Sequence, residues 1–303
     1  MKKEVSFTQK SEKKTVFGIV ATTLILTYAM TLIIPLVWAL LSSVKGRFDF
    51  FDNPLGIPET WKFSNFTAAF EEIHVEITTK QGIRPVYLIE MFWWSIAFAV
   101  GSMIVMQLSR CCCAYVCAKF SKYWLPRIIY SVVIIVMILP IVGSLSSSMQ
   151  VYRALGIYDN MLMWFVASVG FTGSYFLIYY ASFKNISWEY AEAAFIDGAG
   201  HFTVLFKIMM PMIKTTMFGL MLLEFIGLWN DYSTVMIWLP SYPNIAYGLY
   251  RFQFSNSNSA SSVPVQLAGC MLVMLPILII YIIFNIIIFN NKSNFFNPRI
   301  YYY

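Results

Sequence analysis

Six long apolar runs limit what this chain can fold into. Each reaches the length of about 20 residues that a helix needs to cross the hydrocarbon core of a bilayer. Only 12% of the 303 residues are charged, whereas a soluble domain has about one quarter. We therefore expect an all-α integral membrane protein with six transmembrane helices, the second of which continues through Ala118. The runs lie near residues 16–41, 88–110, 127–148, 160–182, 213–238 and 268–290.

The basic residues are distributed unequally between the segments that join these runs. If the N-terminus lies in the cytosol, the inner segments hold 14 of the 21 lysines and arginines, and the outer segments hold the other 7. Basic residues accumulate on the cytosolic side of membrane proteins, so the sequence predicts both termini inside. We expect a cytosolic segment at 1–15, a transmembrane domain at 16–290 and a cytosolic tail at 291–303. The longest outer segment, 42–87, is expected to form a small cap with a helix near Thr67–Ile73.

The residue types that enzyme and metal sites need are scarce or badly placed. The two histidines, His74 and His201, are predicted on opposite sides of the membrane. The sequence has no HExxH motif and no Gly-rich phosphate-binding loop, and its basic residues form no long stretch of the kind that binds nucleic acid. We expect no catalytic residue, no metal site and no nucleic-acid partner. The five cysteines are expected to be small buried hydrophobic residues: Cys111, Cys112, Cys113, Cys117 and Cys270.

The fifth apolar run carries two carboxylates. Glu224 lies deep in the run, and Asp231 follows Trp229 and Asn230 near its end. On one continuous helix, positions 224 and 231 would lie on nearly the same face. A carboxylate inside the membrane usually faces the bundle interior or a water-filled cavity, so these four residues are candidates for a substrate pathway. A polar contact between helices, or a carboxyl group that stays protonated, is the alternative.

Residues 183–212, between the fourth and fifth runs, form a polar segment that the predicted topology places in the cytosol. Ser187 can cap a first helix, and Gly198 and Gly200 can supply a turn before a second helix that starts near His201. We call this segment the elbow. A helix of this kind can enter a groove on a partner and transmit a rigid-body movement. The alternative is an amphipathic connection that lies on the lipid surface.

The elbow carries a motif that resembles a known family. Glu192-Ala193-Ala194-x-x-Asp197-Gly198-Ala199, followed by Pro211, is similar to the "EAA" coupling motif of permeases from binding-protein-dependent ABC importers. Three further stretches resemble the carbohydrate-uptake branch, whose members are similar to the smaller maltose-transporter permease subunit. The likeness runs from about residue 15 to the C-terminus. These stretches are Cys113-Ala114-Tyr115, Met137-Ile138-Leu139-Pro140 and Trp229-Asn230-Asp231.

The resemblance implies a type I ABC importer permease fold in a bacterial cytoplasmic membrane. It implies a second related permease, a cytosolic ATPase dimer that uses ATP and Mg, an extracellular solute-binding protein and a carbohydrate substrate. This chain would bind no cofactor itself. The loops at 42–87 and 239–266 would contact the binding protein. The residues that would couple to the ATPase are Glu192, Ala193, Ala194, Asp197, Gly198, Ala199 and Pro211.

The chain departs from the family pattern at three places. Ile186-Ser187 stands where a proline often precedes the coupling helix, Met210 stands where leucine usually precedes Pro211, and the 42–87 loop is longer than typical. The first two leave the expected fold unchanged. The longer 42–87 loop leaves the exact substrate and its docking partner open.

Two other functions compete with carbohydrate import. An ion-coupled secondary transporter would use Glu224 and Asp231, but it predicts inverted repeats that the sequence does not show clearly. An ABC permease for a peptide or an amino acid would share the elbow, and only the likeness at Trp229-Asn230-Asp231 argues against it. The sequence names neither the sugar nor the ATPase. It also leaves open whether this subunit touches the substrate, and what the 42–87 loop and the tail do.

Overall fold

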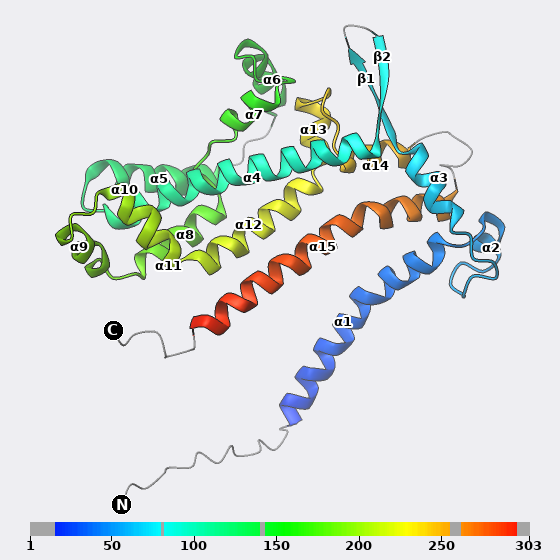
Figure 1. The fold of residues 1–303 in the computed structure, drawn as a ribbon, viewed down its shortest axis with the longest axis horizontal. Helices are drawn as coiled ribbons and strands as arrows, with labels where there is room; N and C mark the ends of the chain where they lie inside the picture. The colour runs from blue at the N-terminus through cyan, green and yellow to red at the C-terminus, as the bar shows by residue number, and fades with distance from the viewer. Residues whose placement is uncertain (1–15, 80–81, 140–142, 255–261, 296–303) are drawn as a thin grey trace, which may run out of the picture.

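The protein is built around a few long helices that lie roughly along one direction (Figure 1). The structure is a computed structural model that describes residues 16–79, 82–139, 143–254 and 262–295. Helix α4 packs against α8 and α12, and α15 packs against α1 and α12. Figure 1 shows a β-hairpin with α2 and α3 at one end of the long helices, and α9 and α10 at the other. The main helices are α1 (Val16–Ser43), α4 (Leu88–Lys119), α8 (Ser174–Lys184), α12 (Lys214–Trp229) and α15 (Val263–Phe295).

Three of the predicted spans are single uninterrupted helices. In the described part of the chain, Phe17–Ser43, Leu88–Lys119 and Val263–Ile282 are each long and apolar enough to cross a membrane. The continuation of the second span through Ala118 is confirmed, because α4 runs unbroken to Lys119. Helix α15 continues past the predicted end at 290 to Phe295. The predicted cytosolic segment 1–15 and residues 296–303 of the predicted tail lie outside the described residues.

The other three predicted spans are not continuous helices. The run at 127–148 forms α5 (Trp124–Ile138), and the next helix among the described residues is α6 (Leu145–Ala154). The run at 160–182 divides into α7 (Met161–Ala167) and α8, which begins after Gly173 with φ 107°. The run at 213–238 divides into α12 and α13 (Tyr232–Trp238). Hydropathy cannot register these breaks, because capping side chains and glycine torsions set them. The count of six spans therefore stays a prediction.

The segment 42–87 forms a small cap, as predicted, but it also contains a hairpin that was not predicted from the sequence. Helix α2 (Arg47–Asp52) precedes α3 (Ser64–Glu72), which lies close to the helix predicted near 67–73. Strands β1 (His74–Thr79) and β2 (Gly82–Tyr87) then pair antiparallel. The Asn65 side chain donates hydrogen bonds of 2.8 Å to the carbonyl oxygens of Ser43 and Lys45. These bonds fix α3 to the end of α1.

The buried apolar residues form two clusters that share α4 and α12. The hairpin-end cluster includes Ile73, Met91 and Phe98 and extends to α14 (Ile245–Gln253). The elbow-end cluster includes Tyr115 and Phe183 and extends into the elbow. Cys111 and Cys117 lie buried in the elbow-end cluster, while the other three cysteines are half-buried. The expectation of small buried cysteines is therefore correct in full for two of the five.

Candidate functional site

The elbow consists of two helical pieces joined by a turn. The first piece is α9 (Glu189–Ile196), and the hydroxyl oxygen of Ser187 accepts a hydrogen bond from the Glu189 N–H at 3.3 Å. Ser187 therefore satisfies one of the N–H groups that the start of a helix leaves unpaired. The second piece runs from His201 to Met212 and meets α12 at an angle of 80°. It is made of α10 (His201–Thr203), the π-helical turn η1 (Val204–Met209) and α11 (Met210–Met212).

Gly198 determines the turn between the two pieces. Its φ is 81°, a left-handed value that glycine adopts far more readily than other residues. The Gly198 N–H donates to the Phe195 carbonyl at 3.0 Å, and the Ala199 N–H donates to the Ala194 carbonyl at 2.9 Å. This pair of bonds is the Schellman C-cap of a helix. Gly200 has φ −81°, which any residue adopts, so the prediction that both glycines supply the turn is correct for Gly198 only.

The inner face of the elbow packs on the end of α4. Ala191 is fully buried, and the centroids of the Phe195 and His201 rings lie 4.9 Å apart. Phe120 directly follows α4. The centroid of its ring lies 5.7 Å from that of Trp188 and 6.1 Å from that of His201. The Lys119 ammonium donates a hydrogen bond to the Ile186 carbonyl. These aromatic contacts, which were not predicted from the sequence, tie the position of the elbow to that of α4.

The outer face of the elbow combines acidic and large apolar side chains. Glu192, Ala193 and Asp197 are exposed, and so are Ile196, at 86% of its surface, and Phe202, at 80%. Large apolar side chains that are exposed beside polar ones are typical of interaction sites in folded proteins. Of the other predicted coupling residues, Gly198 and Pro211 are exposed, while Ala194 and Ala199 are half-buried against the elbow-end cluster.

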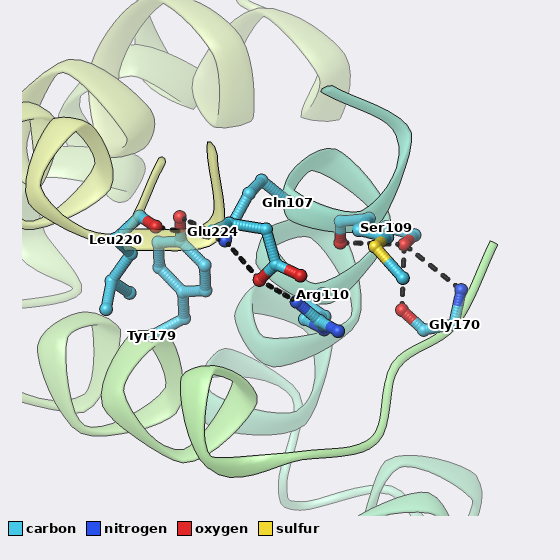
Figure 2. A network of polar contacts seen from close by, with 8 residues as sticks. Gln107, Ser109, Arg110, Gly170, Tyr179, Leu220 and Glu224 are labelled. Carbon is cyan, nitrogen blue, oxygen red and sulfur yellow. Dashed lines mark hydrogen bonds and ion pairs between the residues drawn. The ribbon is translucent and has the colours of Figure 1, made fainter. Parts of the chain in front are cut away.

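Glu224 on α12 forms an ion pair with Arg110 on α4 (Figure 2). Its Oε2 atom lies 2.6 Å from Nη1 of Arg110 and accepts a hydrogen bond from Nε2 of Gln107 at 3.1 Å. The side chains of Arg110 and Glu224 are only 15% and 13% exposed. Gln107 also accepts a hydrogen bond of 2.8 Å from the Tyr179 hydroxyl. The structure thus shows the polar contact between helices that the sequence left open as an alternative.

The residues that bind Glu224 or its partner were not predicted from the sequence: Arg110, Gln107 and Tyr179. A signal was present on α4, because Gln107 and Arg110 are three positions apart and so lie on one face of that helix. Which element that face contacts depends on tertiary packing. Sequence spacing alone does not give it.

Asp231 caps the helix that follows it. Its Oδ1 atom accepts hydrogen bonds of 2.9 Å from the Thr234 N–H and from the Ser233 hydroxyl. Because α12 ends at Trp229 and α13 begins at Tyr232, the expectation that positions 224 and 231 share one helical face is wrong. The capping bonds explain why a carboxylate lies at this break.

Trp229 and Asn230 differ in exposure. Trp229 is buried in the hairpin-end cluster, where its ring lies 5.6 Å from that of Phe225. Asn230 is exposed and lines a shallow cavity of about 170 Å³ together with Tyr232 and Tyr250. These two tyrosine rings stack at 4.4 Å with an angle of 11° between their planes. Of the four pathway candidates, Asn230 is the one whose side chain faces open space most fully.

The sequence profile described as "Binding-protein-dependent transport system inner membrane component" matches residues 111–294. The chain belongs to this family. It is therefore an integral inner-membrane transport component of an ABC transporter and not an enzyme. The matched region contains the whole elbow, Glu224 and the α12–α13 break. Within the described ranges, no group of three or more His, Cys, Asp or Glu side chains gathers in a way that could hold a metal ion.

This permease is similar to several curated proteins. It is 27% identical over 220 residues to the diacetylchitobiose uptake system permease protein of Streptomyces coelicolor, and the alignment covers 71% of this chain and 67% of that protein. It is 22% identical over 256 residues to the melibiose/raffinose/stachyose import permease protein of Bacillus subtilis, covering 82% and 85% of the two chains.

The fold matches that of a solved ABC importer. A chain in the crystal structure of a bacterial ABC transporter that imports the acidic polysaccharide alginate superposes with a TM-score of 0.72 and 18% sequence identity. The superposition covers 90% of this chain and 96% of the other. At this identity the likeness shows that both have the type I ABC permease fold.

Proposed function

We propose that this permease is one of two related membrane subunits of an ATP-driven importer for sugars or oligosaccharides. The observation that carries the proposal is the outer face of the elbow, where Glu192, Asp197 and large apolar side chains lie exposed on, and just after, a short helix with a fixed C-cap. A short helix with exposed apolar side chains suits a groove on a partner protein. We infer that this partner is a cytosolic ATPase dimer, which uses ATP and Mg.

The elbow is connected in a way that suits the transmission of movement. Helix α8 leads into it, and the 80° bend at its far end leads directly into α12. A displacement of α9 by the ATPase would therefore act on both helices. We propose that Glu192, Ala193, Ala194, Asp197, Gly198, Ala199 and Pro211 form the coupling surface and its frame, on the cytosolic side of a six-span topology with both termini inside.

The substrate class rests on relatives, which are named for uptake of diacetylchitobiose and of melibiose, raffinose and stachyose. We propose that the substrate reaches this subunit from an extracellular solute-binding protein that docks at the hairpin end. The exposed Asn230 and its neighbouring cavity are the best candidates for the pathway on this chain, with Asp231 shaping the break beside it. An ion-coupled transporter is less well supported, because Glu224 is already paired with Arg110.

The test is the variant Glu192→Lys, with Glu189→Lys as its control. Both glutamates are exposed in the first turn of α9, so a lysine at either position has a similar unfavourable interaction with the helix dipole. Only Glu192 belongs to the proposed coupling surface. We expect Glu192→Lys to stay in the membrane but to lose substrate uptake and the ATPase activity that co-purifies with the tagged chain, while Glu189→Lys keeps both. Unchanged activity in Glu192→Lys, or equal losses in the two variants, would contradict the docking role.

A further inference from the structure

Three neighbouring side chains of α4 contact three different parts of the bundle (Figure 2). Arg110 reaches Glu224 on α12, and Gln107 reaches both the Leu220 carbonyl on α12, at 3.3 Å, and Tyr179 on α8. The Ser109 hydroxyl donates to the Gly170 carbonyl at 2.8 Å, in the segment between α7 and α8. The middle of α4 is thus bonded to the neighbouring helices through polar groups within an apolar surrounding.

The ion pair is the strongest of these connections. Charge-assisted hydrogen bonds are about twice as strong as neutral ones, and water does not compete well for a pair that is so little exposed. The Arg110 guanidinium also lies 5.7 Å from the centre of the Tyr175 ring on α8. Arg110 therefore contacts α8 and α12 at once. A charge in such a place is costly unless it is paired, so its presence calls for a function.

The location of the pair suggests this function. Helix α8 enters the elbow and α12 leaves it, so a force on the elbow acts on two helices that are separate in sequence. Direct packing between α8 and α12 is much less extensive than the packing of either helix on α4. If nothing joined them, the two helices could respond differently. A connection through α4 would make them respond as one.

We propose that the Arg110–Glu224 ion pair, with Gln107 as its link to Tyr179, is a positioning element that makes α4, α8 and α12 move together when the elbow is displaced. This inference rests on the proposed function, because it assumes that a partner displaces the elbow. It assigns Glu224 to movement of the helices instead of to substrate contact or ion coupling.

The variants separate charge pairing from folding. Glu224→Gln alone would leave an unpaired guanidinium in the bundle and destabilise the fold, because breaking a buried pair by removing one partner is strongly destabilising. The double variant Arg110→Gln/Glu224→Gln removes both charges and leaves none unpaired. The reversed double variant Arg110→Glu/Glu224→Arg restores an ion pair in which the negative charge lies on α4 and the positive charge on α12. Glu90→Gln is the control, because Glu90 pairs with Arg84 in an exposed ion pair at the hairpin end.

The measurement is the distance distribution between spin labels at Ile89 on α4 and Thr215 on α12, both of which are exposed. Labels are introduced through an unnatural amino acid, because the five native cysteines would compete for a thiol reagent. The complex is purified through this chain, placed in lipid nanodiscs and measured without nucleotide and with Mg-ATP and vanadate. Elution as a single species shows that each variant is folded.

We expect one narrow peak under both conditions for the native protein, for Glu90→Gln and for the reversed double variant. The neutral double variant should lose this narrow peak or shift it when nucleotide is added. A peak in the neutral double variant as narrow and as constant as in the native protein would overturn the proposal. Failure of the reversed variant to restore the narrow peak would also overturn it, because charge pairing would then not be the cause.

A second pair of labels tests the proposed function separately. Asn185 at the end of α8 and Leu26 on α1 are exposed, and α1 lies outside the connected group of helices. We expect Mg-ATP and vanadate to shift the distance between them in the native protein. If this distance stays constant, coupling to the ATPase is wrong. The peak width for Ile89 and Thr215 without nucleotide still decides whether the ion pair holds α4 and α12 together.

Discussion

Gly198 shows how one torsion angle positions the elbow. The motif Asp197-Gly198-Ala199 ends α9, and the two hydrogen bonds of the C-cap require the left-handed conformation that Gly198 adopts. A Cβ atom at either Gly198 or Gly200 would meet no heavy atom within 4 Å. The two glycines therefore differ in backbone conformation and not in the space around them, which makes them a matched pair for mutation.

We predict that Gly198→Ala loosens the end of α9 and that Gly200→Ala does not. A left-handed conformation costs an L-residue roughly 1–2 kcal/mol, which corresponds to a factor of about 5–30 in a local opening equilibrium. Amide hydrogen exchange across residues 189–199 should accelerate by about this factor in Gly198→Ala, while Gly200→Ala should match the native protein. Equal exchange rates in the two variants would show that the torsion at Gly198 is not what holds the turn.

At the scale of elements, the interrupted helices explain several polar residues that look like pathway groups in the sequence. Asp231 caps α13 after the break that follows α12, and the Asn160 side chain caps α7 in the same way, by accepting from the Met163 N–H at 3.2 Å. Each cap satisfies backbone groups where a helix begins inside an otherwise apolar run. At the α12–α13 break, the exposed Asn230 lies beside the cavity of about 170 Å³.

We predict that Asp231→Asn preserves the start of α13, whereas Asp231→Ala does not. An asparagine side chain caps a helix about as well as aspartate, while alanine at this position costs about 1 kcal/mol. Thermal unfolding of the purified protein should therefore show a lower midpoint for Asp231→Ala only. If capping is the role of Asp231, transport should likewise fall in Asp231→Ala and stay at the native level in Asp231→Asn. Loss of transport in Asp231→Asn with native stability would instead show that its charge acts in the pathway.

Much of the element pattern follows from the sequence, and the remainder depends on local torsions and on tertiary contacts. The length of the apolar run was enough to predict α1, α4 and α15, because each of these helices is continuous. The β-hairpin was missed because its alternation of exposed and buried residues, as at Glu76 and Ile77, covers only one short strand. The partner of Glu224 was missed because Arg110 lies 114 positions away in sequence, and only packing brings them together.

At the scale of the whole molecule, this chain leaves a large apolar surface uncovered. None of the apolar window of α1 is buried within the chain, although the helix touches α15. The outer face of the elbow is also uncovered, at the opposite end from the β-hairpin (Figure 1). Lipid suits the first surface, but the acidic and apolar mixture on the elbow suits a protein. The chain is therefore best understood as one part of a larger assembly.

The most direct test of the proposed importer is affinity purification of the tagged chain from its own membranes in mild detergent, followed by mass spectrometry of the proteins that remain bound. We predict a second permease, an ABC ATPase and a sugar-type solute-binding protein in the native sample. The Glu192→Lys sample should keep the second permease and lose the ATPase. Recovery of the chain alone, or only with further copies of itself, would contradict the proposal that it is one subunit of an ATP-driven importer.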